Sequence, residues 1–392
     1  MRCLNATVSS LLLDSIHGVA DEEKVSSNRL VQAVANLSRL FTKERNHLNR
    51  SYLNDQALGT AYLLYFLPVN LAKIQVLLNE MPVPEASQRF SVLDIGSGPG
   101  TGALAVLDWW HQQQPSHAVT VTAVDGARAA LEQARRLWDR YCQAAGVGEA
   151  SLHVYEGDLE GRAWLEQVKQ RANFDLIILA NSLNEISAGE KDSIKTRANM
   201  VGEALSLLAP HGTMMIVEPA LRETSRELHL VRDRLLQERR CTVYSPCLHE
   251  LNCPALVKPD DWCHEERPWE PPAVIQEIDK QVGFIKDALK FSYLLLRKDG
   301  KTITERRPDV YRVVSELRTM KGEKRAWLCN EQGRQEVGRQ DRLASPRNEP
   351  FDQWHRGAIV QIEKIVHKEQ RGKISALGRI ERDGAVQIVR SA

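Results

Sequence analysis

The middle of the chain alternates short apolar runs with amphipathic stretches, a pattern typical of parallel strands joined by helices. The apolar runs are nearly continuous, as expected for strands that are covered on both faces. They lie at 92–95, 118–124, 151–156, 174–181 and 210–219. We therefore predict a Rossmann-like, doubly wound α/β core that begins near residue 89.

The segments on either side follow other patterns. Residues 1–88 read as helices, with an almost wholly apolar stretch that Pro68 should kink or break, and this part should pack over a ligand site in the core. After the core come a cysteine-rich stretch at 241–272, a helix near 273–288 and the strand K-F-S-Y-L-L-L-R. Short strand-like pieces punctuated by glycine follow residue 300 and predict a small β-barrel. The expected domains are 1–88, 89–299 with the insertion 241–272, and 300–392.

Charge is distributed unevenly along the chain. The formal net charge of the 392 residues is +1, but residues 297–392 hold 22 Lys and Arg against 14 Asp and Glu, so the rest has a net charge of −7. A basic C-terminal quarter is either a solvated surface or a surface that binds nucleic acid. No apolar run approaches the ~20 residues that span a bilayer, and acidic residues at 14 and 21–23 argue against an export or transit signal. We expect a monomeric bacterial cytoplasmic protein that does not enter membranes, with the mitochondrial matrix as the alternative location.

A glycine-rich loop follows the first predicted strand of the core. The segment V-L-D-I-G-S-G-P-G-T-G at 92–102 runs from a strand into a turn and a helix. Its spacing only partly matches the fingerprint of dinucleotide sites, and that fingerprint has no acidic group at the position of Asp94. A carboxylate there suits a ligand that has an amino group. The segment resembles motif I of class I S-adenosylmethionine (SAM) methyltransferases.

Polar residues end the later strands where that fold would need them. Asp125 and Gly126 close the second strand, where the resemblance implies a carboxylate for the ribose, and Asp158 and Leu159 follow the third, where it implies contacts to the adenine. Each acid taken alone could be a solvated loop residue, but their register argues for a common ligand. The expected SAM-binding residues are Asp94, Gly96, Ser97, Gly98, Pro99, Gly100, Asp125, Gly126, Asp158, Leu159 and Asn181.

Cysteines crowd into one segment of the chain. Four of the seven, at 241, 247, 253 and 263, lie within a proline-containing, loop-like stretch. An odd number of cysteines and no export signal disfavour disulfides. The spacings match neither zinc ribbons nor radical-SAM enzymes, so a zinc ion, an iron–sulfur cluster and inert buried thiols all remain open.

The motifs together resemble a methyltransferase-like family of small-ribosomal-subunit assembly factors, known in mitochondria and with bacterial relatives. The resemblance rests on G-S-G-P-G-T-G, A-N-S-L-N-E, I-V-E-P, S-P-C-L-H-E-L-N-C-P, D-W-C-H and F-S-Y-L, and on the upstream S-Y-L-N-D-Q-A-L-G-T-A-Y-L-L-Y-F-L-P-V-N. It covers about residues 50 to 390. The cysteine motif is its most specific part.

The resemblance implies a four-cysteine [4Fe–4S] site and binding to small-subunit ribosomal RNA. The family pattern falls on Cys247, Cys253 and Cys263, and its fourth ligand on Cys329, which begins a C-x-x-x-G segment. This assignment displaces Cys241, the choice that spacing alone favours. Leu248 stands where proline is usual in the family, which removes no ligand. We expect His249 and His264 to be hydrogen-bond donors near the ligands, or contacts to RNA phosphate.

Two functions of different classes fit these features. In one, a SAM-dependent methyltransferase modifies ribosomal RNA by positioning the acceptor, and Asn181 and Glu185 are the weak catalytic candidates. In the other, a SAM-binding but catalytically silent factor docks on the small ribosomal subunit. The absence of the Asn/Asp-Pro-Pro-aromatic motif after the fourth strand favours the second. A small-molecule methyltransferase with a structural zinc is the alternative, but it leaves the basic C-terminal part unexplained.

Overall fold

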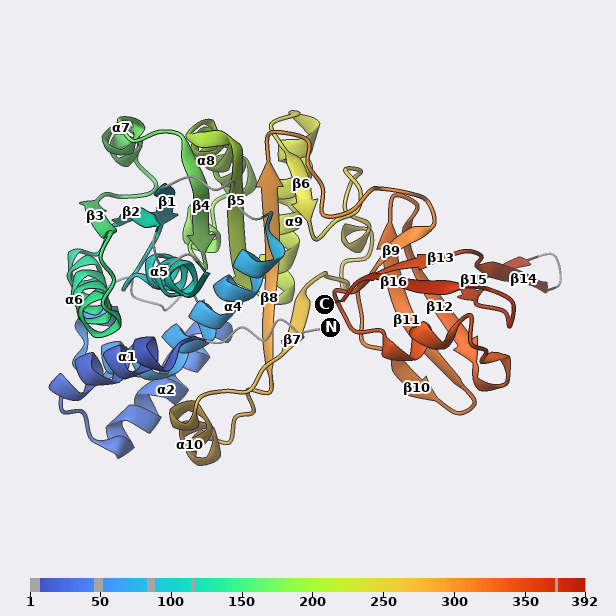
Figure 1. Ribbon diagram of the computed structural model, residues 1–392, viewed down its shortest axis with the longest axis horizontal. Coiled ribbons are helices and arrows are strands. Elements are labelled where there is room, and N and C mark those ends of the chain that lie inside the picture. The colour runs from blue at the N-terminus through green and yellow to red at the C-terminus, as the bar shows by residue number, and fades with distance from the viewer. Residues whose placement is uncertain (1–7, 46–51, 83–88, 114–116, 371–372, 392) are drawn as a thin grey trace.

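The computed structural model has a larger α/β part and a smaller β part placed side by side (Figure 1). It describes residues 8–45, 52–82, 89–113, 117–370 and 373–391. Cys3 lies outside these residues. The N-terminal helices, the central sheet and the helix α10 form the larger part, and the chain enters the smaller part after β8.

Helices make up the described N-terminal segment. Their bounds are α1 Ser10–Glu22, α2 Ser27–Thr42, η2 Tyr52–Asn54, α3 Gln56–Ala61, η3 Tyr62–Phe66 and α4 Leu67–Glu80. The expected kink or break at Pro68 is instead a π-helical turn, η3, directly before it. Proline has no amide hydrogen and crowds the carbonyl of the preceding turn, and a wider turn there accommodates both effects while the helix continues.

The helix formed by α3, η3 and α4 contradicts the prediction that no apolar run approaches the length that spans a bilayer. Gln56–Glu80 is 25 residues long, with a mean hydropathy of 1.5, and is therefore apolar enough to cross a membrane by composition. However, 72% of its most apolar window is buried inside the molecule, against α5 and the other N-terminal helices. Its apolar surface is covered by protein, as in the core helix of a folded domain.

The central sheet has the predicted doubly wound order. Its strands are β1 Arg89–Ile95, β2 Ala118–Asp125, β3 Ala150–Glu156, β4 Phe174–Ala180, β5 Leu208–Pro219, β6 Thr242–Ser245, β7 Glu265–Pro268 and β8 Ala288–Arg297. They are arranged β3-β2-β1-β4-β5-β8-β6, with β7 also on β8. The first five strands are parallel, whereas β8 is antiparallel to β5.

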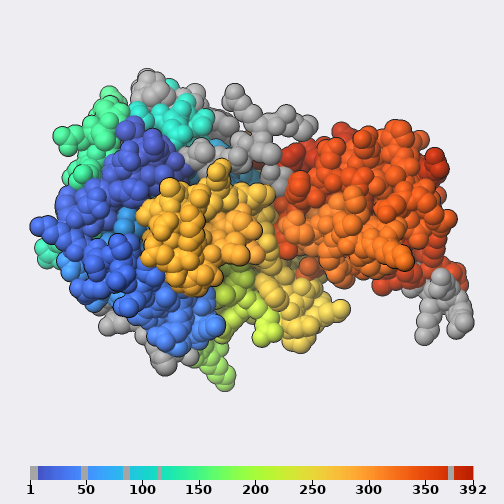
Figure 2. Space-filling view, turned by 90° about the horizontal axis from the view of Figure 1, so that it is seen from below, coloured from blue at the N-terminus to red at the C-terminus, as the bar shows by residue number. Residues whose placement is uncertain are grey.

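Helices connect the parallel strands and cover both faces of the sheet. They are α5 Thr101–Gln113, α6 Arg128–Ala145, α7 Ala163–Lys169, α8 Ser193–Ser206 and α9 Arg222–Gln237, with the short η4 Leu183–Glu185 after β4. The strand order reverses between β1 and β4, so the carboxyl ends of these strands flank the crevice where such folds bind ligands. Figures 1 and 2 show α1, α2 and α10 gathered below the sheet.

The cysteine-rich stretch lies between two short strands. Both β6 and β7 pair with β8, and the loop between them contains only the turn η5 Pro254–Leu256. The helix predicted at 273–288 is shorter, because α10 spans Ala273–Val282 and ends at Gly283 in the left-handed conformation. Glycine adopts this conformation without a steric cost and stops the helix there.

The C-terminal part is a curved sheet. Its strands are β9 Val310–Val313, β10 Arg318–Met320, β11 Glu323–Asn330, β12 Gly333–Gln340, β13 Ile359–Ile362, β14 Val366–Gln370, β15 Lys373–Arg379 and β16 Val386–Arg390, with the turns η6 Asp341–Leu343 and η7 Glu349–Gln353. Its apolar core includes Phe351 and Trp354.

The predicted barrel is not closed among the described residues. The order is β14-β15-β12-β11-β9-β13-β16, and the two end strands do not pair with each other. The Arg390 guanidinium of β16 donates to the Glu80 carbonyl (3.3 Å), so this end strand contacts the α/β part.

A buried ionic network joins the two parts. Arg312 of β9 donates to Glu265 (2.7 Å) and to the Tyr293 hydroxyl (2.9 Å). Arg267 donates to Glu80 (3.1 Å), and the Tyr293 hydroxyl donates to the same carboxylate (2.5 Å). Although burial alone would raise it, the pKa of Glu80 is lowered because Arg312 and Arg267 stabilise the ionised form.

Removing one arginine from this network should lower the stability of the folded protein. Arg312→Met leaves the buried carboxylates of Glu80 and Glu265 with Arg267 as their remaining cation. We therefore expect the free energy of unfolding to fall by up to about 3 to 5 kcal/mol, measured by chemical denaturation. Arg307→Met, which removes an exposed arginine paired with Asp309, is the matched control and should change stability little. Equal losses in the two variants would contradict a structural role for the network.

Candidate functional site

The glycine loop lies between the carboxyl end of β1 and the start of α5. The amides of Gly96 and Ser97 donate to the Val124 carbonyl of β2 (2.8 and 3.1 Å), which holds the loop against the next strand. Gly96 has a positive φ of 71°, and a Cβ there would lie 2.4 Å from Cβ of Ser182. No other residue fits this position, because the β4 side approaches the loop so closely.

Asp94 is buried beneath this loop. Its side chain is 1% exposed, and Oδ2 accepts a hydrogen bond from the Ala103 amide (2.9 Å) in the first turn of α5. The Gly102 amide also lies beside this carboxyl group and favours its ionised form. A Cβ at Gly102 would lie 2.5 Å from Oδ1, so glycine is needed there as well. Burial raises the pKa of Asp94 to about 7.

Asp125 organises the same loop from the end of β2. Its Oδ2 accepts from the Gly98 amide and its Oδ1 from the Ala127 amide, both at 2.8 Å. Burial raises its pKa. A Cβ at Gly98 would meet no atom within 4 Å, so this glycine borders open space. The carboxylate predicted for a ribose therefore lies directly beside the loop predicted for the rest of the ligand.

The residues predicted to hold an adenine follow β3. Asp158 is exposed, and its Oδ1 accepts from the Glu160 amide (3.1 Å). Leu159 lies near the glycine loop, since a Cβ at Gly96 would be 3.3 Å from its Cδ1. Gly126 lies beside the start of the same segment, since a Cβ there would be 3.7 Å from the Gly157 carbonyl oxygen. The ends of β1, β2 and β3 thus come together as predicted from their order in the sequence.

The segment after β4 closes the other side of the site. Asn181 has a positive φ of 59°, unusual for a residue other than glycine and frequent near functional sites. The Asn184 side chain donates to Glu218, a 1% exposed carboxyl group whose pKa burial raises to about 8. Arg45 donates to the Asn184 side chain. Glu185 is exposed. The Asn184 side chain is therefore hydrogen-bonded within the protein through both its oxygen and its nitrogen.

A second candidate site lies at the junction of the two parts. One cavity is lined by Cys247, Cys253, Cys263 and Cys329, whereas Cys241 is not among its lining residues. The first three thiols come from the loop between β6 and β7, and the fourth comes from β11 of the C-terminal sheet. The described cysteines form no disulfide. Burial raises the pKa of Cys263 to about 11 and that of Cys329 well above its usual range.

Helix α9 holds the cysteine loop in place through hydrogen bonds, a role that we did not predict from the sequence. The fully buried Arg232 guanidinium donates to the carbonyls of His249 (2.6 Å) and Leu251 (2.9 Å), and the Asp233 carboxylate accepts from the Cys253 amide (2.9 Å). One Nη of Arg226 donates to three further loop carbonyls, those of Ala255, Lys258 and Asp261. The spacing of polar residues along one face of α9 is the sequence feature that could have predicted this contact. These bonds satisfy the carbonyls of a loop without regular structure.

Histidines and arginines surround the cavity. His249 Nε2 lies 3.8 Å from the Cys329 sulfur, and His264 contacts Glu266 (2.9 Å). Burial lowers the pKa of His249 to about 4, so it is neutral. Arg334 and Arg356 also line the cavity and bring positive charge from the C-terminal sheet.

The four thiols are not arranged around a single ion. In the described part of the chain, no three of the His, Cys, Asp and Glu side chains are placed to hold one metal ion. A tetrahedral zinc site needs sulfurs about 3.8 Å apart, because each Zn–S bond is about 2.3 Å long. A cluster of several irons and sulfides keeps its thiolates farther apart than one ion does.

The sheet topology and the glycine loop define the class of protein. A parallel sheet in the order β3-β2-β1-β4-β5, extended by an antiparallel β8, with a glycine loop after β1 and acids at the next strand ends, is the class I methyltransferase fold.

The chain belongs to the Rsm22 family. The family model described as mitochondrial small ribosomal subunit Rsm22 matches residues 56–339. This range includes the glycine loop and the four cysteines that line the cavity. The family resemblance inferred from the motifs is thereby confirmed. None of the curated proteins compared with the chain matches it.

Solved methyltransferase structures resemble the chain only distantly. The small RNA methyltransferase HEN1 is 11% identical (TM-score 0.36), and the match covers 59% of this chain and 26% of that one, about a quarter of its length. The CurJ carbon methyltransferase is 15% identical over 72% of this chain and 70% of its own (TM-score 0.36). A SAM-dependent methyltransferase from Leishmania major is 11% identical over 72% and 91% (TM-score 0.35).

Proposed function

We propose that this protein is a SAM-binding, iron–sulfur-containing factor that acts on the small ribosomal subunit by binding its RNA. The observation that carries the proposal is the meeting of thiols from two domains in one cavity, in a chain of the Rsm22 family that also has the methyltransferase glycine loop. The family description is mitochondrial, which supports the mitochondrial matrix over the bacterial cytoplasm.

Binding of SAM is supported by the groups left available at the carboxyl edge. Asp94 is a buried carboxyl group beneath the glycine loop, which suits the ligand's ammonium group, and Asp125 borders the open space beside Gly98. The bound ligand would supply an electrophilic methyl group. The protein would contribute orientation and the exclusion of water.

A [4Fe–4S] cluster is the metal centre that we propose for the cavity, following the family resemblance. The cavity brings together four cysteines from two parts of the chain, and a metal centre would displace the protons of these buried thiols on binding. The loaded site would be anionic because four thiolates outweigh the charge of the cluster core, and Arg334 and Arg356 offset that charge. The ligands would be Cys247, Cys253, Cys263 and Cys329, and the cluster would fix the C-terminal sheet to the core.

A catalytically silent factor is favoured over a methyltransferase by the residues after β4. Asn184 is held by Glu218 and Arg45, and no Asn/Asp-Pro-Pro-aromatic motif follows the strand. Asn181 and Glu185 remain the candidates if methyl transfer occurs.

The direct test is to incubate anaerobically purified protein with radiolabelled SAM and small ribosomal subunits, mature and immature. Co-sedimentation without label in the RNA would support a silent assembly factor, and label at one nucleotide would establish a methyltransferase. If the protein neither co-sediments nor transfers label, the small-molecule alternative with a structural zinc would be favoured.

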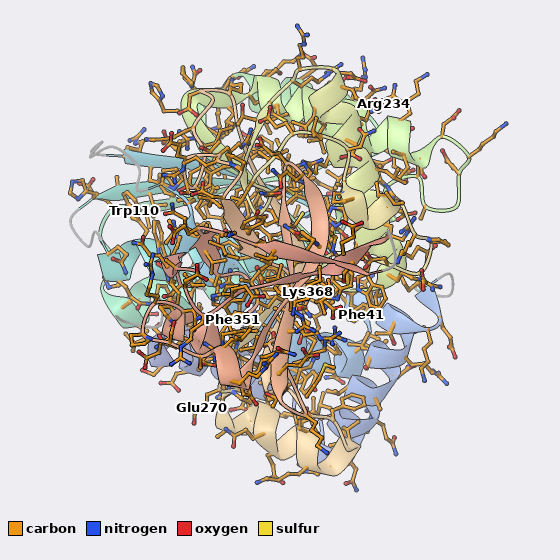
Figure 3. The ribbon with its side chains drawn as sticks, turned by 90° about the vertical axis from the view of Figure 1, so that its right-hand side faces the viewer. Phe41, Trp110, Arg234, Glu270, Phe351 and Lys368 are labelled. Atoms are coloured by element: carbon orange, nitrogen blue, oxygen red, sulfur yellow. The ribbon has the colours of Figure 1, made fainter. Side chains whose placement is uncertain are left out.

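Binding to RNA should depend on the exposed lysines of the C-terminal sheet. Lys364 and Lys368 have no ion-pair partner among the described residues, and Lys368 lies on the face turned away from the core (Figure 3). We expect the affinity for ribosomal RNA to fall steeply with salt, and Lys364→Glu and Lys368→Glu each to reduce the log–log slope by about 0.7 to 0.9. Filter binding at several salt concentrations measures both.

The matched control is Lys195→Glu, which reverses an exposed charge on α8 of the core. It should leave the slope unchanged. A flat salt response in the unaltered protein would place the RNA contact elsewhere or exclude it.

A further inference from the structure

A layer of aromatic side chains from α2, η2 and η3 packs near the start of α5. Phe41 of α2 packs edge-on against Tyr52 of η2 (centroids 5.5 Å apart) and Phe66 of η3 (5.1 Å). Tyr52 and Tyr62 are themselves 6.1 Å apart, at 51°. Figure 3 shows Phe41 on the helical side of the molecule. These side chains come from segments about 30 to 60 residues before the glycine loop and share no motif with it.

Two members of the layer reach the candidate site. The Tyr62 hydroxyl lies 3.5 Å from the Thr101 hydroxyl, at the first residue of α5 after the loop. Burial raises the pKa of Tyr52 and of Tyr62, and the nearby carboxylates of Asp125 and Glu185 raise both further. The Tyr62 phenol therefore lies at the start of α5, and the ring of Tyr52 packs beside it.

This position is where the charged centre of the proposed ligand would fall. If Asp94 held the amino acid end of SAM and Asp125 its ribose, the sulfonium would lie between these two groups. A sulfonium has a full positive charge and no hydrogen to donate. Aromatic rings attract such a cation through their negative faces, more strongly where water is excluded.

We propose that Tyr52 and Tyr62 form an aromatic wall that recognises the sulfonium of SAM. The proposal rests on the proposed SAM binding and adds a specificity: the site distinguishes SAM from its demethylated product, S-adenosylhomocysteine, by charge. The two ligands share every group that Asp94, Asp125 and Asp158 would contact. They differ in the sulfur, which is cationic in one and a neutral thioether in the other.

The test is isothermal titration of both ligands into the full-length protein and three variants. Tyr62→Leu removes the aromatic face, and we expect it to weaken SAM by about 5- to 30-fold and S-adenosylhomocysteine much less. Tyr62→Phe keeps the face and should retain the preference for SAM. Phe66→Leu changes the same layer without a group that reaches Thr101, so it controls for loosened packing.

The outcomes separate this proposal from the one on which it rests. Equal weakening of both ligands by Tyr62→Leu, or a preference lost equally in Phe66→Leu, would overturn the aromatic wall while leaving SAM binding intact. Failure of the unaltered protein to bind either ligand would overturn both. Thermal melts without ligand establish that each variant is folded before it is titrated.

Discussion

Cys329→Ser should remove the iron and the brown colour from protein purified without oxygen. Of the four thiols that line the cavity, that of Cys329 comes from the C-terminal sheet, and the other three come from a loop of the core. Serine keeps the size of the side chain, but its hydroxyl is a poor ligand for iron. We expect iron content to fall several-fold, as measured by metal analysis and by absorption near 400 nm.

Cys241→Ser is the matched control for this prediction. Cys241 packs among apolar residues outside the cavity, and burial raises its pKa to about 12. We therefore expect this variant to keep its iron. Retention of iron in Cys329→Ser together with loss in Cys241→Ser would show that spacing alone had selected the right fourth thiol. Zinc in place of iron in the unaltered protein would contradict the cluster.

Asp94→Asn should weaken SAM binding by about 10- to 100-fold, the effect of losing a hydrogen bond to a charged group, roughly 1.5 to 3 kcal/mol. Asparagine has nearly the shape of aspartate and keeps an acceptor for the Ala103 amide, so the fold should survive. Titration calorimetry at pH 8 measures the difference. Full affinity in this variant would refute the placement of the ligand's ammonium group.

The same carboxyl group predicts how SAM affinity depends on pH. Burial raises the pKa of Asp94 to about 7 in the free protein, so the group is mostly protonated at pH 6. A bound cation favours the carboxylate and lowers that pKa, so binding at pH 6 releases a proton and affinity rises as the pH increases through 7. Asp125 and Glu218 also have raised pKa values and would contribute.

Comparison with Asp94→Asn isolates the contribution of Asp94. Below the pKa of Asp94, the SAM affinity of the unaltered protein should rise by up to about tenfold per pH unit. Asp94→Asn should lack this part of the rise between pH 6 and pH 8. Calorimetry in two buffers of different ionisation enthalpy counts the protons released. An unchanged proton count in Asp94→Asn would assign the release to another group.

The local parts of this protein were predictable from its sequence. The strands, the glycine loop and the acids at the strand ends are determined by residues close together in the chain, since apolar periodicity and glycine content act over a few positions. The parallel order then brings Asp94 and Asp125 to one edge, because the carboxyl ends of adjacent parallel strands meet there. Cys329 was predicted only through the family resemblance.

Contacts between distant segments were decided by the tertiary structure. The convergence of the β11 thiol with a loop some 70 residues earlier, the support of that loop by α9, and the tyrosines above the glycine loop all depend on how whole elements pack. The C-terminal sheet also stays open, among the described residues, where its strands predicted a barrel. Sequence patterns specify each element and its buried face, whereas the partner of that face is selected by packing among all the elements at once.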